Sequence, residues 1–194
     1  MTNIKFGTDG WRAIIAKEFT TDNVARVAYA TAIWLKNQHT EPSAIVGHDC
    51  RFGGKLFAET VTKVLTAQGV KVYLAQGIVS TPMISLGCFK LNANVGVVIT
   101  ASHNPADYNG YKLKSTYGGP TTPEEIAKVE ALIPETTEIP ATTIEQLISE
   151  GKVIITALED MYFEHAVNNF DLDAIKNAGM VFAYDAMYGA GQKI

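Results

Sequence analysis

The chain has 194 residues, of which 47% are hydrophobic and 19% charged, and its formal net charge is −4 at pH 7. This length suits one domain of ordinary size with part of a second, and the apolar content is sufficient for a buried core. The negative charge and the lack of a basic stripe exclude a general attraction to nucleic acid or to an anionic membrane.

The first half of the chain alternates helical segments with short, β-branched, apolar runs. Helices are predicted over 20–38, over 53–69 and from residue 80 onward, and strands over 44–47, 70–75 and 94–100. Gly69 stops the second helix in the usual manner, and Pro82 sits at a first-turn position of the third. Strands that alternate with helices imply crossover connections and therefore a mainly parallel sheet.

The segment that follows position 100 changes this pattern. A strand is expected over 111–115 after a loop too short for a helical crossover, so we predict that it runs antiparallel at an edge of the sheet. The predicted fold is therefore α/β: a mixed, mainly parallel sheet of about four strands between helices, with one antiparallel edge strand.

The last third of the chain predicts a domain boundary. Helices are expected over 123–133, 144–150, 158–170 and 172–178, with a Pro- and Thr-rich connector over 134–143. A new strand over 180–185 then runs into the Gly-rich turn Tyr188-Gly189-Ala190-Gly191. Because an α/β domain characteristically begins in this way, we expect residues 1–156 to form one domain and residues 157–194 to be linker helices and the first strand of a truncated second domain.

The segment Thr100-Ala101-Ser102-His103-Asn104-Pro105 is the strongest functional signal. It places the Ser102 hydroxyl in a loop at the end of a buried strand, together with an imidazole, an amide and the downstream Lys112. A serine after a strand is often only a helix cap. A hydrolase is disfavoured because the chain has no Gly-x-Ser-x-Gly elbow here. A serine that carries phosphate fits the loop better, because phosphate needs donors and cations around it.

Two smaller clusters also suit an anion. Phe6-Gly7-Thr8-Asp9-Gly10-Trp11-Arg12 combines flexible glycines with the planar guanidinium of Arg12, which matches phosphate or carboxylate oxygens. Arg12 paired with a surface acid in a structural turn is the alternative. Asp49 and Arg51 follow a predicted strand, where ligands gather in open α/β sheets. They can equally form a local pair that braces the loop, and the two roles are compatible.

The remaining reactive side chains predict no further site. Cys50 and Cys88 are not spaced as a disulfide framework or a zinc site, so we expect free thiols. Residues 1–7 lack the apolar core of a signal peptide, and no apolar run approaches transmembrane length. We therefore expect a cytoplasmic protein with no nucleic-acid or membrane partner.

Together these motifs resemble the α-D-phosphohexomutases, the phosphoglucomutase/phosphomannomutase superfamily. The resemblance rests on five segments in matching order: Phe6 to Arg12, Asp49-Cys50-Arg51, Thr100 to Pro105, Asn109-Gly110-Tyr111-Lys112, and Asp185 to Gly191. The Ser-His-Asn-Pro loop with its downstream Asn-Gly-x-Lys is the most specific of them.

The resemblance implies an intramolecular phosphotransferase. Ser102 would be the phosphorylated serine that exchanges phosphate with a hexose phosphate through a glucose or mannose 1,6-bisphosphate intermediate, which interconverts the 1- and 6-phosphates. Lys112 would act as general acid and base, and Arg12 would stabilise charge. His103 is similar to the histidine beside the nucleophile and Asn104 to the residue that orders the loop.

The resemblance also implies a Mg²⁺ cofactor, to which Ser102 would contribute one oxygen through its phosphate. The family's other metal ligands lie in an Asp-Gly-Asp-x-Asp-Arg loop that this chain lacks, and one phosphate cannot hold Mg²⁺ alone. The expected partners are therefore the hexose phosphate and the missing C-terminal domains of the same enzyme, and we expect the chain alone to be inactive. The alternative function is a non-catalytic module of the same fold that binds a phospho-ligand or another protein.

Overall fold

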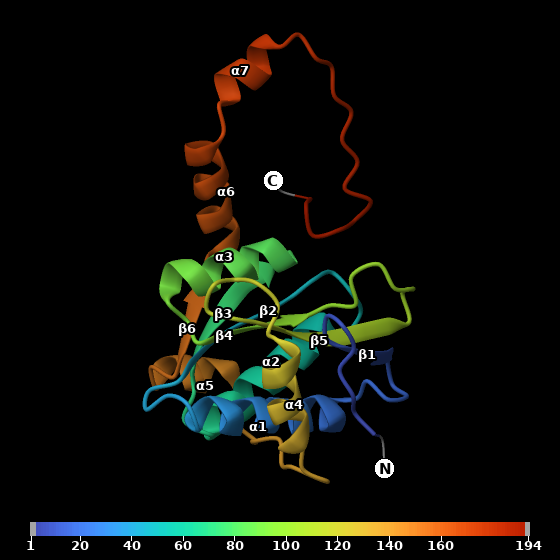
Figure 1. Ribbon diagram of the computed structural model, residues 1–194, viewed down its shortest axis with the longest axis vertical. Coiled ribbons are helices and arrows are strands. Elements are labelled where there is room, and N and C mark those ends of the chain that lie inside the picture. The colour runs from blue at the N-terminus through green and yellow to red at the C-terminus, as the bar shows by residue number, and fades with distance from the viewer. Residues whose placement is uncertain (1–2, 193–194) are drawn as a thin grey trace.

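The computed structural model describes residues 3–192, whose centre is a six-stranded sheet (Figure 1). In chain order the strands are β1 (Trp11–Ile14), β2 (Ser43–His48), β3 (Lys71–Ile78), β4 (Val95–Ile99), β5 (Tyr108–Lys114) and β6 (Val153–Thr156). Across the sheet their order is β1-β5-β4-β2-β3-β6. The four strands β4, β2, β3 and β6 pair in parallel, whereas β5 is antiparallel to both of its neighbours. The predicted mixed, mainly parallel sheet is confirmed.

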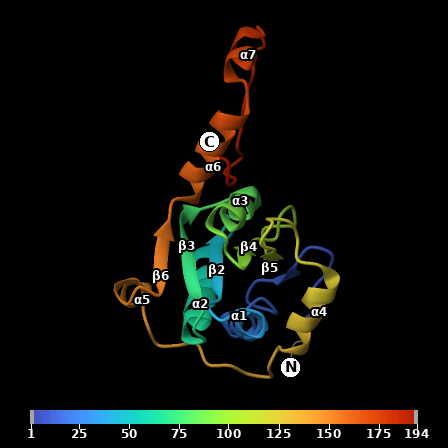
Figure 2. The ribbon, with the colours of Figure 1, turned by 60° about the vertical axis from the view of Figure 1, so that its left-hand side comes forward.

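Helices cover both faces of this sheet. The helices of residues 3–192 are α1 (Thr21–Lys36), α2 (Gly54–Ala67), α3 (Thr81–Leu91), α4 (Pro123–Ala131), α5 (Ile144–Ser149), α6 (Leu158–Asn169) and α7 (Leu172–Asn177). Figures 1 and 2 show α1, α2 and α5 on one face and α3 on the other, while α6 starts beside α3 and leads away from the sheet toward α7. Among the described residues, no helix combines the length and the apolar character that crossing a bilayer demands.

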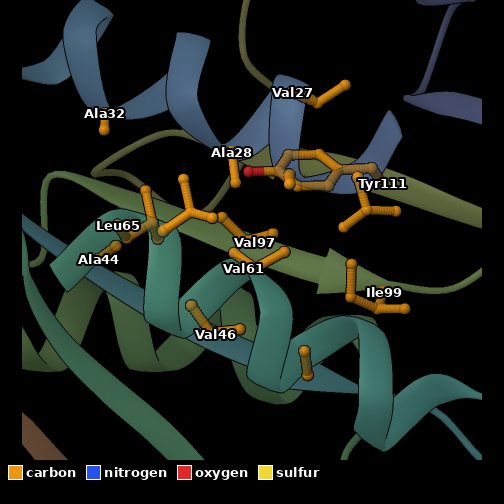
Figure 3. Close-up of a cluster of buried hydrophobic side chains, with 14 of the residues drawn as sticks. Val27, Ala28, Ala32, Ala44, Val46, Val61, Leu65, Val97, Ile99 and Tyr111 are labelled. Atoms are coloured by element: carbon orange, nitrogen blue, oxygen red, sulfur yellow. The ribbon is translucent and has the colours of Figure 1, made fainter. Parts of the chain in front are cut away.

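The main core lies between the sheet and the pair α1 and α2. Small residues on α1, such as Ala28 and Ala32, let this helix approach the strands closely, and Val61 and Leu65 of α2 fill the space beside them (Figure 3). Tyr111 of β5 is fully buried in the same cluster. A second, smaller cluster packs α3 and the start of α6 against the opposite face. The two clusters make the sheet a rigid support for the loops at its carboxyl edge.

The sheet differs from the prediction at both edges. It has six strands in place of about four, because β1 and β6 were not expected as strands. The strand expected at the edge over 111–115 is internal, since β1 pairs with β5 and takes the edge position. At the other edge β6 pairs in parallel with β3.

The strand expected over 180–185 is not present in the structure. Residues 180–185 form no strand, and Val181 is 99% exposed. Within residues 3–192 no other strand pairs with this segment, and an extended segment without a partner has no hydrogen-bond ladder to hold it. The two helices predicted between 157 and 178 are confirmed as α6 and α7.

Candidate functional site

The loop that follows β4 and the loop that follows β2 meet at the carboxyl edge of the sheet. These strands are parallel neighbours, so both chains leave the sheet at the same edge, where open α/β sheets bind ligands. The backbone N–H of Asp49 donates to the carbonyl of Ile99 at 3.1 Å and joins the two loops where they begin. The loop that contains Ser102 therefore starts from a fixed position.

A chain of hydrogen bonds runs from Asp49 to Ser102. The Thr100 hydroxyl donates to Oδ2 of Asp49 at 2.5 Å, and the same hydroxyl oxygen accepts from the backbone N–H of Ser102 at 3.0 Å. Ser102 has φ 57°, in the left-handed region that non-glycine residues seldom occupy. Such a conformation persists only where surrounding contacts determine it, and Thr100 supplies one of those contacts.

Arg51 clamps the serine loop from the β2 side. Its Nη1 donates to the carbonyls of Pro105 and Tyr108 at 2.8 and 3.0 Å, and its Nη2 donates to those of Ser102 and Asn104 at 2.8 and 2.6 Å. Its Nε lies 3.5 Å from Oδ2 of Asp49. The bracing Asp–Arg pair that the sequence left open is thus present, and the residue it braces is the arginine that fixes the serine loop.

Arg12 joins this loop from the edge strand β1. It lies opposite Gly110 of β5, and Gly110 in turn accepts a hydrogen bond from the N–H of Thr100 at 3.0 Å. The Arg12 guanidinium donates through Nη1 to Oδ1 of Asn104 at 2.8 Å. A Cβ at Gly110 would lie 2.5 Å from the Thr100 carbonyl oxygen, so only glycine allows the three strands to approach this closely.

The structure brings five of the seven predicted site residues into one hydrogen-bonded group: Ser102, Asn104, Asp49, Arg51 and Arg12. His103 is exposed, and within residues 3–192 its side chain has no hydrogen-bond partner. Lys112 lies further along β5, where it is buried and paired with Asp9 at 2.6 Å.

Lys112 forms a cluster with Lys114 and Asp9, which the sequence analysis did not name as site residues. Lys114 is also buried, and its Nζ lies 3.4 Å from Oδ1 of Asp9. Partial burial on its own would raise the pKa of Asp9, but the hydrogen bond and charge of Lys112, together with Lys114, hold that pKa below its ordinary value. The alternation Lys112-Leu113-Lys114, which puts both lysines on one face of a strand, was the signal that could have revealed this cluster.

An open hollow lies directly over the serine loop. It has a volume of about 560 Å³ and is lined by Ser102, Thr100, Asn104 and Arg51, together with the exposed ring of Phe52. Ser102 itself is exposed. No helix begins at Ser102, since β5 is the element that follows β4, so the serine does not act as a helix cap.

The residues around Ser102 do not by themselves fit a Mg²⁺ site. Magnesium takes near-octahedral oxygen coordination, usually with one or two carboxylates. Asp49 is the carboxylate that lines the hollow over Ser102, and Thr100 and Arg51 already occupy its oxygens. Nowhere in residues 3–192 do three histidine, cysteine, aspartate or glutamate side chains gather as metal ligands.

Comparison with known proteins places this geometry in context. The model of the phosphoglucomutase/phosphomannomutase α/β/α domain I matches residues 3–140. A phosphoglucomutase of Staphylococcus haemolyticus is 30% identical over 200 residues, which cover 100% of this chain and 36% of the relative. A phosphoglucosamine mutase of Clostridium acetobutylicum is 32% identical over 189 residues, which cover 97% of this chain and 41% of the relative. The chain thus spans well under half the length of these relatives.

Solved structures agree with the sequence comparison. A Thermus thermophilus protein assigned as a phosphomannomutase superposes with a TM-score of 0.84 and 36% identity, over 93% of this chain and 39% of its own. The phosphoglucomutase parafusin of Paramecium, at 20% identity, shares the fold with a TM-score of 0.83 over 96% of this chain and 39% of its own.

Proposed function

Because the chain belongs to the phosphoglucomutase/phosphomannomutase family, we propose that Ser102 takes a phosphoryl group from a hexose bisphosphate and returns one to a hexose monophosphate. The observation that supports this most strongly is the loop itself. Ser102 is an exposed hydroxyl at the mouth of a hollow, on a backbone held by Arg51 and Thr100. Phosphoryl transfer requires mainly positioning and charge neutralisation, and this loop provides both.

The transfer balances with the residues of this site. The Ser102 oxygen forms a bond to phosphorus while the bond from phosphorus to the sugar oxygen breaks. The departing sugar oxygen takes a proton from an ammonium group, and the neutral amine that this leaves takes the serine proton. We assign both proton transfers to Lys112, which lies on β5 two residues from Gly110, the residue that connects Thr100 with Arg12.

Arg12 and Arg51 have separate tasks in this proposal. Arg12 uses one guanidinium nitrogen for Asn104, which leaves the rest of its fork for phosphate oxygens. Both terminal nitrogens of Arg51 donate to backbone carbonyls, so Arg51 holds the Ser102 loop in place. Asn104 orients Arg12, and the exposed imidazole of His103 is free to contact a phosphate on Ser102.

We further propose that residues 1–156 act as the phosphoserine domain of a larger enzyme, with residues 157–194 leading into a second domain. The relatives are more than twice as long as this chain, and a Mg²⁺ site needs more ligands than the surroundings of Ser102 offer. The chain alone therefore accepts a phosphoryl group but does not complete the interconversion. The two unpaired cysteines fit the reducing cytoplasm, where we place this function.

Two assays on the chain test this proposal. Incubation with glucose or mannose 1,6-bisphosphate should add one phosphoryl group to the intact protein, as read by mass spectrometry. A coupled assay for conversion of hexose 1-phosphate to 6-phosphate should show no turnover. Turnover near the ordinary enzyme value of ~10 s⁻¹ would refute the need for further domains. Binding of phosphate without transfer would favour the non-catalytic module.

A further inference from the structure

Two lysines of β5 are buried against a single carboxylate. Because side chains alternate along a strand, Lys112 and Lys114 share one face, and their side chains are only 4% and 7% exposed. Lysine is almost never buried without a partner. Both ammonium groups reach Asp9, at 2.6 Å and 3.4 Å, and within residues 3–192 neither has another acidic partner.

The cluster therefore holds more positive than negative charge. One carboxylate balances one ammonium, so the second lysine leaves an excess of one positive charge in a mostly buried place. Arg12 adds a further cation, because Arg12, Gly110 and Lys112 lie on the same face of neighbouring strands. Among residues 3–192 the Arg12 guanidinium bonds only to the neutral Asn104 amide. Buried charge is costly unless compensated, so an arrangement that served stability alone would contain balanced or apolar side chains. An excess of cations suits an incoming phosphate.

The turn before β1 is built to deliver Asp9 to these lysines. The N–H of Gly7 donates to the carbonyl of Gly10 at 3.0 Å and closes a tight turn around Asp9. Gly10 has φ 96°, and a Cβ there would lie 2.7 Å from Cγ of Lys112. The glycines thus let the turn lie flat on β5, with the Asp9 carboxylate over both ammonium groups.

From this geometry we propose that Asp9 is a positioning residue for Lys112 and that Lys114 is the second cation of the same site. The inference rests on the proposed function. Before phosphate arrives, Asp9 fixes the Lys112 ammonium. An incoming phosphate competes with Asp9 for Lys112, and Lys114 keeps the Asp9 carboxylate paired while Lys112 turns toward the phosphate.

Opposite effects on binding and on transfer test this role. With inorganic phosphate as the probe, Asp9→Asn should bind about tenfold more tightly than the wild type, because a competing negative charge is removed. The same variant should accept a phosphoryl group from hexose 1,6-bisphosphate about 10- to 100-fold more slowly, because Lys112 loses its fixed position. Lys114→Met should bind phosphate about tenfold more weakly. Lys128→Met, in an exposed ion pair on α4, is the control for lost charge and should match the wild type.

The outcomes separate this inference from the proposed function. If Asp9→Asn lowers phosphate affinity and transfer rate together, or changes neither, Asp9 does not position Lys112 and the inference is overturned. If the wild type binds no phosphate, both proposals fail. If it binds phosphate but accepts no phosphoryl group, the proposed transfer fails and the phosphate affinities alone decide on the lysine pair. Should Asp9→Asn fail to fold, the double variant Asp9→Asn/Lys114→Met, with one buried charge fewer, takes its place.

Discussion

The Nη2 of Arg51 lies 2.8 Å from the carbonyl oxygen of Ser102, so an arginine that follows β2 holds the backbone of the serine that follows β4. Three more carbonyls of the same loop accept from this guanidinium. The loop is thereby fixed without any use of the Ser102 hydroxyl, which stays exposed. This separation of support from chemistry is what the proposed nucleophile requires.

The four hydrogen bonds from Arg51 to the Ser102 loop predict that Arg51→Lys is less stable than the wild type. A lysine has a single ammonium in place of a planar fork and cannot bond four carbonyls on two sides. We expect the free energy of unfolding to fall by about 2 kcal/mol, since several charge-assisted hydrogen bonds are lost. Urea denaturation measures this loss, and hydrogen exchange should show reduced protection of the amides over 102–108. Lys55→Met, at an exposed position on α2, should change neither quantity.

The turn that presents Asp9 predicts that Gly10→Ala is costly. Gly10 has φ 96°, and the new Cβ would clash with Lys112 and with the Tyr111 carbonyl, each at 2.7 Å. We expect a loss of about 3 kcal/mol in the free energy of unfolding, from backbone strain and steric overlap together.

Gly69→Ala provides the matched control for this substitution. Gly69 has φ 83°, but nothing lies within 4 Å of the added Cβ. It should cost only about 1 kcal/mol, the penalty of the left-handed conformation alone. Equal losses for the two substitutions, measured by urea denaturation, would mean that close packing at Gly10 contributes nothing.

The lowered pKa of Asp9 predicts a pH dependence of stability. Partial burial opposes the shift, but the hydrogen bond and charge of Lys112 outweigh it and hold the folded-state pKa below the ordinary 3.8. The unfolded chain therefore binds a proton at higher pH than the folded one. The stability that this pair contributes is present above about pH 4 and is lost as the pH falls through the folded-state pKa.

Chemical denaturation of the wild type and of Asp9→Asn between about pH 2 and pH 6 measures this effect. The stability difference between them should be constant in the upper part of that range and shrink as the solution becomes more acidic. A difference that grows toward low pH would contradict the assignment.

The two cysteines should react very differently. Cys50 is exposed in the loop after β2, whereas burial raises the pKa of the Cys88 thiol to about 12. A thiol-specific reagent at about pH 8 should therefore label Cys50 rapidly and Cys88 only after denaturation. Two rapidly labelled thiols in the folded protein would show that the packing of α3 on the sheet is wrong.

The elements with strong local signals were predictable from the sequence. Buried strands such as β4, with its β-branched run, and helices with a clear apolar face such as α1 were predicted close to their observed bounds. The edge strands were missed for different reasons. β1 is four residues long and lies within a glycine-rich motif, so its alternation of buried and partly exposed residues is too short to indicate a strand. β6 is a short apolar run two residues after Gly151, and the sequence analysis did not assign it as a strand.

The segment over 180–185 was predicted as a strand on local composition, which cannot tell whether a partner strand is present. In the site, too, local motifs were predictable from the sequence, whereas contacts between distant residues were not. The Ser102 loop and Arg51 are visible as local motifs, but the bond between Arg12 and Asn104 joins residues 92 positions apart. The pairing of Lys112 and Lys114 with Asp9 spans more than a hundred positions and depends on β1 lying beside β5.

The most direct test asks which atom receives the phosphoryl group. The wild-type chain, Ser102→Ala and the control Ser149→Ala, which changes an exposed serine on α5, are incubated with hexose 1,6-bisphosphate and mapped by peptide mass spectrometry. One phosphoryl group on the peptide that contains Ser102, present in the wild type and in Ser149→Ala but lost in Ser102→Ala, is the predicted result. A folded wild type that takes up no phosphoryl group, or a Ser102→Ala variant labelled as strongly as the wild type, would contradict it.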